Sequence, residues 1–137
     1  MKVLAFVLLA CVLLPASSAL AEQDAINEEW VLPTGGGPHS FSFTLSAAAP
    51  IFVEMAPVKH VDKGVTLRIV PAEDFDACTG KSQGACRSLG GFDGFQVRSF
   101  SHTEPVPAGR WTFYAQNTQN LMFKAIVHVH LVVNPGT

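Results

Sequence analysis

An alternation of apolar and polar residues with a period of two recurs along most of this chain. It is regular over residues 41–45, 51–55, 65–69, 95–98, 111–116 and 125–133. This period is typical of β-strands that bury one face, and turn-forming residues separate the segments. Strands joined by short turns favour antiparallel sheets, and two such sheets must pack together to shield their apolar faces. The pattern predicts an all-β fold: an antiparallel β-sandwich or jelly roll of seven to eight strands.

Two local features refine this prediction. Pro71, which is followed by acidic residues, predicts one short helical turn ahead of Cys78. In the segment 111–116 we expect Trp111 on the core face, in register with Phe113 and Ala115.

The first 21 residues have the pattern of a secretory signal peptide. Lys2 precedes an apolar run over residues 3–14, and Ala19-Leu20-Ala21 has the A-x-A form of a cleavage site. The run is too short to cross a bilayer as a helix. We expect cleavage near Ala21, a single β-sandwich domain over residues 22–137 without a transmembrane segment, and a secreted or periplasmic protein. The alternative, lipidation of Cys11, would require a cut within the apolar run.

The charge of the mature chain bears on its partners. Without Lys2 the chain keeps eight basic and eleven acidic residues, a net charge of −3. This balance provides no electrostatic attraction for nucleic acid, which we exclude as a partner, and none for an anionic membrane surface.

Two cysteines remain after cleavage, Cys78 and Cys86, with seven residues between them. In an oxidising compartment such a pair is expected to form a disulfide, which would stabilise the fold by roughly 2.5 kcal/mol. The pair lacks the C-x-x-C spacing and the neighbouring histidine of a zinc site.

The sequence offers possible metal ligands at two places. His128 and His130 lie two apart in the segment 125–133, so their side chains project from one face about 7 Å apart. A zinc or copper ion would need a third ligand from His60, His102 or Glu54. Because the odd-numbered residues of this segment are apolar and must face the core, both histidines belong on the outer face. We therefore expect no metal and no cofactor, and keep these two histidines as the candidates.

Acidic residues near the cysteines offer oxygen ligands of the kind that suit calcium. The spacing lacks the D-x-D-x-D-G order of a calcium loop, which favours a solvated acidic turn. The residues are Glu73, Asp74, Asp76 and Asp93.

Residues 80–84 spell G-x-S-x-G, the nucleophile motif of many hydrolases, with Ser82 at its centre. That chemistry requires a sharp strand-to-helix turn on a largely parallel sheet, and no helical pattern follows Ser82. We expect no catalytic residue here.

Aromatic residues outside the core register are a further indication of function. Phe52 and Tyr114, with Phe92 or Phe100 beside them, would form an exposed platform for a sugar or a peptide. The alternative is burial of these rings at the edge of the core.

Several stretches resemble known secreted modules. Residues 39–45, 51–54 and 64–69 resemble the opening strands of bacterial pre-peptidase C-terminal domains, and residues 107–113 resemble their strand entry with a glycine and an aromatic residue. The last stretch, extended through Asn117, also resembles the closing strands of GOLD-type sandwiches. The aspartate-rich strand ends that some pre-peptidase domains use for calcium are absent around Val65. The resemblance implies a jelly-roll accessory or binding module without catalytic residues of its own.

These observations favour a secreted or periplasmic, non-catalytic module that binds a protein or a carbohydrate. The alternatives are a small hydrolase or metal-dependent enzyme that uses the histidines and the acidic loop, and a structural subunit of an envelope or assembly.

Overall fold

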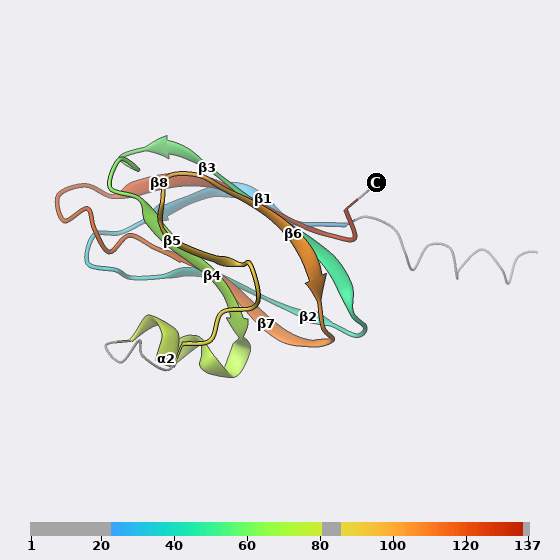
Figure 1. The fold of residues 1–137 in the computed structure, drawn as a ribbon. Coiled ribbons are helices and arrows are strands. Elements are labelled where there is room, and N and C mark those ends of the chain that lie inside the picture. The colour runs from blue at the N-terminus through green and yellow to red at the C-terminus, as the bar shows by residue number, and fades with distance from the viewer. Residues whose placement is uncertain (1–22, 81–85, 136–137) are drawn as a thin grey trace, which may run out of the picture.

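The computed structural model describes residues 23–80 and 86–135 (Figure 1). They form eight strands and one short helical segment between the fourth and fifth strands. In chain order the elements are β1 (Gln23–Leu32), β2 (His39–Leu45), β3 (Ala49–Lys59), β4 (Val65–Pro71), the 3-10 turn η1 (Ala72–Asp74), α2 (Phe75–Thr79), β5 (Asp93–Val97), β6 (Phe100–Val106), β7 (Gly109–Gln116) and β8 (Ala125–Val133).

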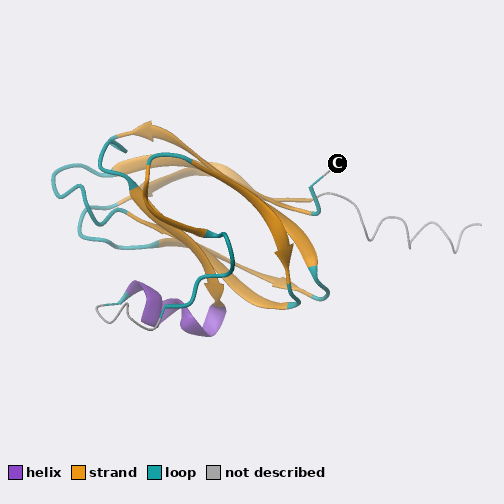
Figure 2. Cartoon of the chain, viewed as in Figure 1, coloured by secondary structure: helices purple, strands orange, loops and turns teal. Residues whose placement is uncertain are grey.

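The strands form two four-stranded sheets that pack face to face (Figure 2). Sheet A has the order β1-β8-β3-β6 and sheet B has the order β2-β7-β4-β5, and every neighbouring pair is antiparallel. The prediction of an all-β sandwich with seven to eight strands is therefore confirmed. Five of the six alternating segments lie entirely in strands. The segment 95–98 overlaps β5, which ends at Val97, and its Phe95 is 61% exposed rather than buried as the alternation predicted.

Two strands, β1 and β6, were not among those segments. A bulge between Asp24 and Ile26 shifts the register of β1 against β8. Beyond the bulge, Glu28 interrupts the apolar pattern of the buried residues Ile26, Trp30 and Leu32. In β6 the inward positions alternate correctly, but His102 and Glu104 occupy two of them, so the apolar pattern is lost.

The core lies between the sheets and is made of the alternating residues. Val127, Val129 and Leu131 of β8 are fully buried, which confirms that the odd-numbered residues of this strand face the core. Phe113 and Ala115 of β7 meet them from sheet B. Trp111 is less buried than the pattern predicted: it packs at the margin of the core, and its Nε1 donates a hydrogen bond to the Pro107 carbonyl oxygen at 3.0 Å.

The helical segment lies on the outer face of sheet B (Figure 2). It begins after Pro71, as predicted, and continues through Cys78 rather than ending before it. Val70, Cys78 and Tyr114 are buried under it in a second apolar cluster, with Phe75 packed against them.

The two ends of the sandwich differ. The segments 33–38, 60–64, 98–99 and 117–124 gather at one end, because Leu32 pairs with Ala125, His39 with Ala115, and Val65 with Val97. We call this the loop end; it is on the left in Figure 1. The first residue of β1, Gln23, pairs with Val133 at the opposite end, where the C-terminus lies. We call that the terminal end. Within residues 23–80 and 86–135, no helix is long and apolar enough to cross a membrane.

Candidate functional site

The β7–β8 segment presents three consecutive apolar side chains to solvent at the loop end. Leu121, Met122 and Phe123 are 76%, 81% and 50% exposed. We call these three residues the tip. Figure 1 shows the segment extending beyond its neighbours at that end. Contiguous exposed apolar side chains on a folded domain mark sites of interaction.

Two buried asparagines hold the tip in place. The Oδ1 atom of Asn120 accepts hydrogen bonds from the backbone N–H groups of Met122 at 3.1 Å and Phe123 at 2.9 Å. Asn117 donates from Nδ2 to the Phe123 carbonyl oxygen at 3.1 Å and accepts from the Asn120 N–H at 3.1 Å. The tip is therefore supported by side chains that are themselves buried, so its exposure does not reflect a loose chain.

A cavity of about 390 Å³ lies beside the tip, and a second of about 210 Å³ adjoins it. Both are lined by His60 and Asp62. The His60 ring stacks on Phe123 with 4.5 Å between the ring centres. His60 has a φ of 57°, a backbone conformation that is uncommon outside glycine and is often found at functional sites.

The charges at the loop end differ from those of the whole chain. Its described loops and the strand ends beside them hold four basic residues and a single acidic one, Asp62. Arg98 lines the smaller cavity, and its Nε donates to the Asp62 carbonyl oxygen at 3.1 Å. The four basic residues are Lys59, Lys63, Arg98 and Lys124. This end combines apolar contact surface, a stacked ring pair and positive charge.

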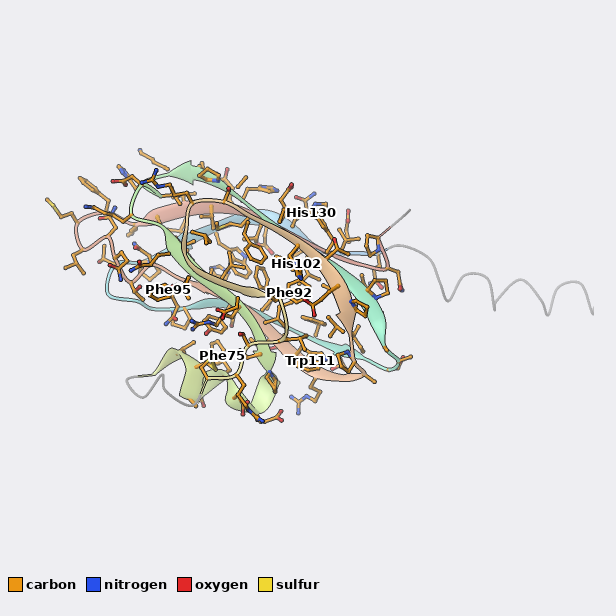
Figure 3. All side chains as sticks on the ribbon, in the orientation of Figure 1. Phe75, Phe92, Phe95, His102, Trp111 and His130 are labelled. Carbon is orange, nitrogen blue, oxygen red and sulfur yellow. A yellow bond between two sulfur atoms is a disulfide. The ribbon has the colours of Figure 1, made fainter. Side chains whose placement is uncertain are left out.

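His128 and His130 lie on the outer face of sheet A, as predicted, and each is hydrogen-bonded to β1. His130 Nε2 lies 3.0 Å from Asp24 Oδ1, and His128 Nε2 lies 2.5 Å from Asn27 Oδ1. Figure 3 shows His130 on this face, where Glu54 of β3 pairs with it across the ladder.

The predicted third ligands do not all join this histidine pair. His60 is at the loop end and His102 points into the sandwich, so only Glu54 is a neighbour. In the part of the chain that the structure describes, no group of three histidine, cysteine or acidic side chains could hold a metal ion.

A histidine and a glutamate that the alternation pattern did not single out meet at the edge of the sandwich. The Glu104 Oε1 atom accepts hydrogen bonds from the Gly91 N–H and from His102 Nε2, each at 2.6 Å. These two bonds hold the pKa of Glu104 below its ordinary value. His102 also contacts Phe92 edge to face, with ring centres 5.0 Å apart, as Figure 3 shows. These contacts hold the segment before β5 against β6.

The predicted aromatic platform is wrong. Tyr114 is fully buried because η1 and α2 cover it, and Phe92 is fully buried between the sheets. Phe52 is half-buried on the outer face of sheet A, with its ring 6.0 Å from that of His130, edge to face. Phe100 is partly buried against the core on the inner face. Because these rings lie on different surfaces, they cannot form one site.

The cysteine and acidic residues form a structural region around α2. Cys78 and Cys86 are joined in a disulfide with 4.6 Å between their Cα atoms, as predicted. Asp74 pairs with Arg87 at 3.1 Å, Asp93 pairs with Arg68 at 2.7 Å, and Glu73 and Asp76 are exposed. The acids are thus divided between separate ion pairs and solvent. Ser82 of the G-x-S-x-G motif lies outside the described residues.

The alternation pattern of the sequence did not identify the tip. The available signal was a run of three apolar residues, 121–123, that follows a turn and breaks the period of two. A run of this kind outside a strand has no core face to occupy, which distinguishes it from the buried segments.

No protein-family model matches the chain, and no curated protein matches it. Among solved structures, the crystal structure of the pre-peptidase C-terminal domain of collagenase from Bacillus anthracis is similar. It has 11% sequence identity and a TM-score of 0.50, and the match covers 77% of this chain and 87% of that one. Identity this low bears on the fold alone. The chain therefore has the fold of a pre-peptidase C-terminal domain, as the resemblance in its opening strands implied.

Proposed function

We propose that this protein is a secreted or periplasmic, non-catalytic binding module, and that the loop end is its binding surface. The observation that carries the proposal is the tip: three exposed apolar side chains held in place by two buried asparagines beside a cavity. Keeping such side chains in water is unfavourable, and a bound partner would remove that cost.

Three further features support the proposal. The disulfide suits an oxidising compartment, in agreement with the signal-peptide pattern of residues 1–21. The fold is that of a module attached to a collagenase in the similar structure. The residues that line the larger cavity offer amide, apolar and charged groups, which are the usual contents of a ligand site.

The test compares the wild-type protein with Leu121→Ser/Met122→Ser on a panel of immobilised glycans, peptides and lipids. We expect at least one ligand that the wild type retains and the double variant loses. Phe95→Ser is the matched control, because Phe95 is 61% exposed on β5 and lines neither cavity. A ligand bound equally well by the double variant would contradict the assignment of the loop end.

Export and the absence of catalysis have tests of their own. Mass spectrometry of the exported protein should find Glu22 at its N-terminus, whereas a lipidated Cys11 there would contradict the proposed cleavage. Incubation with a chromogenic ester should show no turnover above background. Ester hydrolysis that disappears in Ser82→Ala would support the hydrolase alternative and overturn the non-catalytic assignment.

A further inference from the structure

The tip and the positive charges at the loop end have a definite spatial relation. The β7–β8 segment extends beyond its neighbours in Figure 1, and Lys63 of the β3–β4 turn lines the cavity directly beside it. Lys124 follows the tip in sequence and is exposed. A surface that met this end would therefore contact the apolar tip first and the lysines next.

The charge of the loop end favours an anionic occupant. Four basic residues accompany one acidic residue there, although the mature chain as a whole carries net negative charge. Most of the acidic residues consequently lie elsewhere: Glu28 and Glu29 along β1, Glu73 and Asp76 on the helical segment, and Glu54 on β3. The total charge, from which no attraction to an anionic membrane was expected, conceals this separation.

The residue types at the tip favour a lipid surface over a sugar or a protein. The strongest protein contact sites rely on tryptophan, tyrosine and arginine. Of these three types, the residues lining the two cavities include only one arginine, Arg98, which lines the smaller cavity. Phe123 is the tip's single aromatic ring, and one of its faces is already covered by His60. Leucine, methionine and phenylalanine rimmed by lysine and arginine are the composition of segments that enter the interface of a bilayer.

We infer that the loop end docks on an anionic lipid bilayer, with the tip inserted among the lipids and the surrounding lysines on the headgroups. The inference rests on the proposed function, because it assigns a partner to the same surface. The asparagine bonds contribute by holding the tip in its exposed conformation before contact, which reduces the entropy lost on docking.

The experiment is co-sedimentation of the purified protein with vesicles. One set contains phosphatidylcholine alone, and the other contains phosphatidylcholine with phosphatidylglycerol. We expect the wild type to pellet with the mixed vesicles at low ionic strength and to be released as salt is added, because salt screens the charges. Leu121→Ser/Met122→Ser should lower the partition coefficient by at least roughly tenfold.

Charge variants test the second half of the inference. Lys63→Gln/Lys124→Gln should weaken binding to the mixed vesicles roughly 30-fold, the effect expected for the loss of two cations. Arg110→Gln is the matched control, because Arg110 is exposed at the start of β7, at the terminal end. Phe95→Ser serves as the apolar control. All four variants change exposed side chains, and unchanged melting temperatures would show that they remain folded.

The outcomes separate this inference from the proposed function. Equal pelleting with both vesicle types, or binding that survives in the tip variant, would overturn the docking inference. Absence of pelleting, together with an immobilised glycan or peptide that the wild type binds and the tip variant does not, would also overturn it and would identify a sugar or protein partner for the same binding surface. If neither vesicles nor array ligands depend on the tip, both proposals fail.

Discussion

The loop end and the outer face of sheet B differ in whether the chain covers the apolar side chains that lie there. Each presents an aromatic side chain that does not belong to the main core: Phe123 at the loop end and Tyr114 on β7. On sheet B the chain adds η1, α2 and a disulfide, and these cover Tyr114 completely. At the loop end, hydrogen bonds with two buried asparagines hold Phe123 and its neighbours in an exposed position.

The comparison shows that a region can be firmly held in place without being buried. Both regions are anchored, one by apolar packing and a covalent bond, the other by hydrogen bonds to backbone groups. Only the outer face of sheet B is covered by other parts of the chain. Because the tip is exposed despite firm support, its exposure is better explained by a role in contact with a partner than by weak packing.

Alanine substitutions at the two aromatic residues should give the largest contrast. Tyr114→Ala should lower the free energy of unfolding by about 3–5 kcal/mol, the range for removing a large buried ring. Phe123→Ala should cost about 1 kcal/mol or less, because half of the side chain is already in solvent. Denaturant unfolding measures both values. Similar losses would show that the tip belongs to the core and would remove the distinction between the regions.

Removal of the disulfide should destabilise the region around α2 and leave the loop end unchanged. Cys78→Ser/Cys86→Ser should cost about 2–3 kcal/mol, because the open chain has more conformational freedom when unfolded. Vesicle binding by the folded variant should remain at the wild-type level. In freshly exported wild-type protein, alkylation without reductant should label neither thiol; labelling of both would contradict the bond.

A third variant tests the support of the tip. Asn120→Ala should cost about 1–2 kcal/mol, because the N–H groups of Met122 and Phe123 would lose their partner. Hydrogen exchange at these two amides should accelerate while amides of β8 stay protected. Gln119→Ala is the control, since Gln119 is exposed and bonds only to Thr118 within the described contacts. Unchanged exchange in Asn120→Ala would mean that other contacts hold the tip.

Glu104 should make the stability of the sandwich depend on pH. Its pKa is lowered by the hydrogen bonds from His102 and Gly91, so its contribution to stability is present above the ordinary carboxyl pKa. That contribution is lost as the pH falls through the lowered pKa. Glu104→Gln should therefore be about 1 kcal/mol less stable than the wild type at neutral pH. The two proteins should converge in acid; a constant difference would show that the charge of Glu104 is not responsible.

The smallest effect is expected on the uncovered outer face of sheet A. His128→Ala/His130→Ala should change stability by only a few tenths of a kcal/mol, since both bonds to β1 are exposed. Zinc should leave the melting temperature unchanged in both proteins. A rise in the wild type alone would indicate a metal site, because a ligand held by the native state stabilises it.

The fold was more predictable than the candidate site, for physical reasons. Residues 50–56 of β3 and residues 125–131 of β8 alternate because one face of each strand lies in the core, so local sequence reports their structure. The burial of Tyr114 depends on where residues 72–79 fold back, and no local pattern contains that information. The strand β6 escaped prediction because its inward His102 and Glu104 satisfy each other, and a mutual hydrogen bond cannot be inferred from alternation.

The loop end was harder to predict than the fold, because its residues come together only after the strands pair. Lys63 and Lys124 are 61 positions apart in the chain and reach the same end through the pairings of β3, β4, β7 and β8. Total charge averages over this separation, so the net charge of −3 for the mature chain has the opposite sign to the charge of the loop end. A run of apolar residues that follows a turn, as at 121–123, was the one local signal.

The start of β1 at residue 23 and the end of β8 at residue 133 lie together at the terminal end, which has a geometric consequence. β8 runs nine residues from the loop end to the terminal end, roughly 30 Å for an extended strand. A module docked through its tip would hold residue 23 and residue 133 at about that height above the bilayer. It would then act as a spacer as well as an anchor, and whatever the chain carries at these ends would be kept clear of the lipid headgroups.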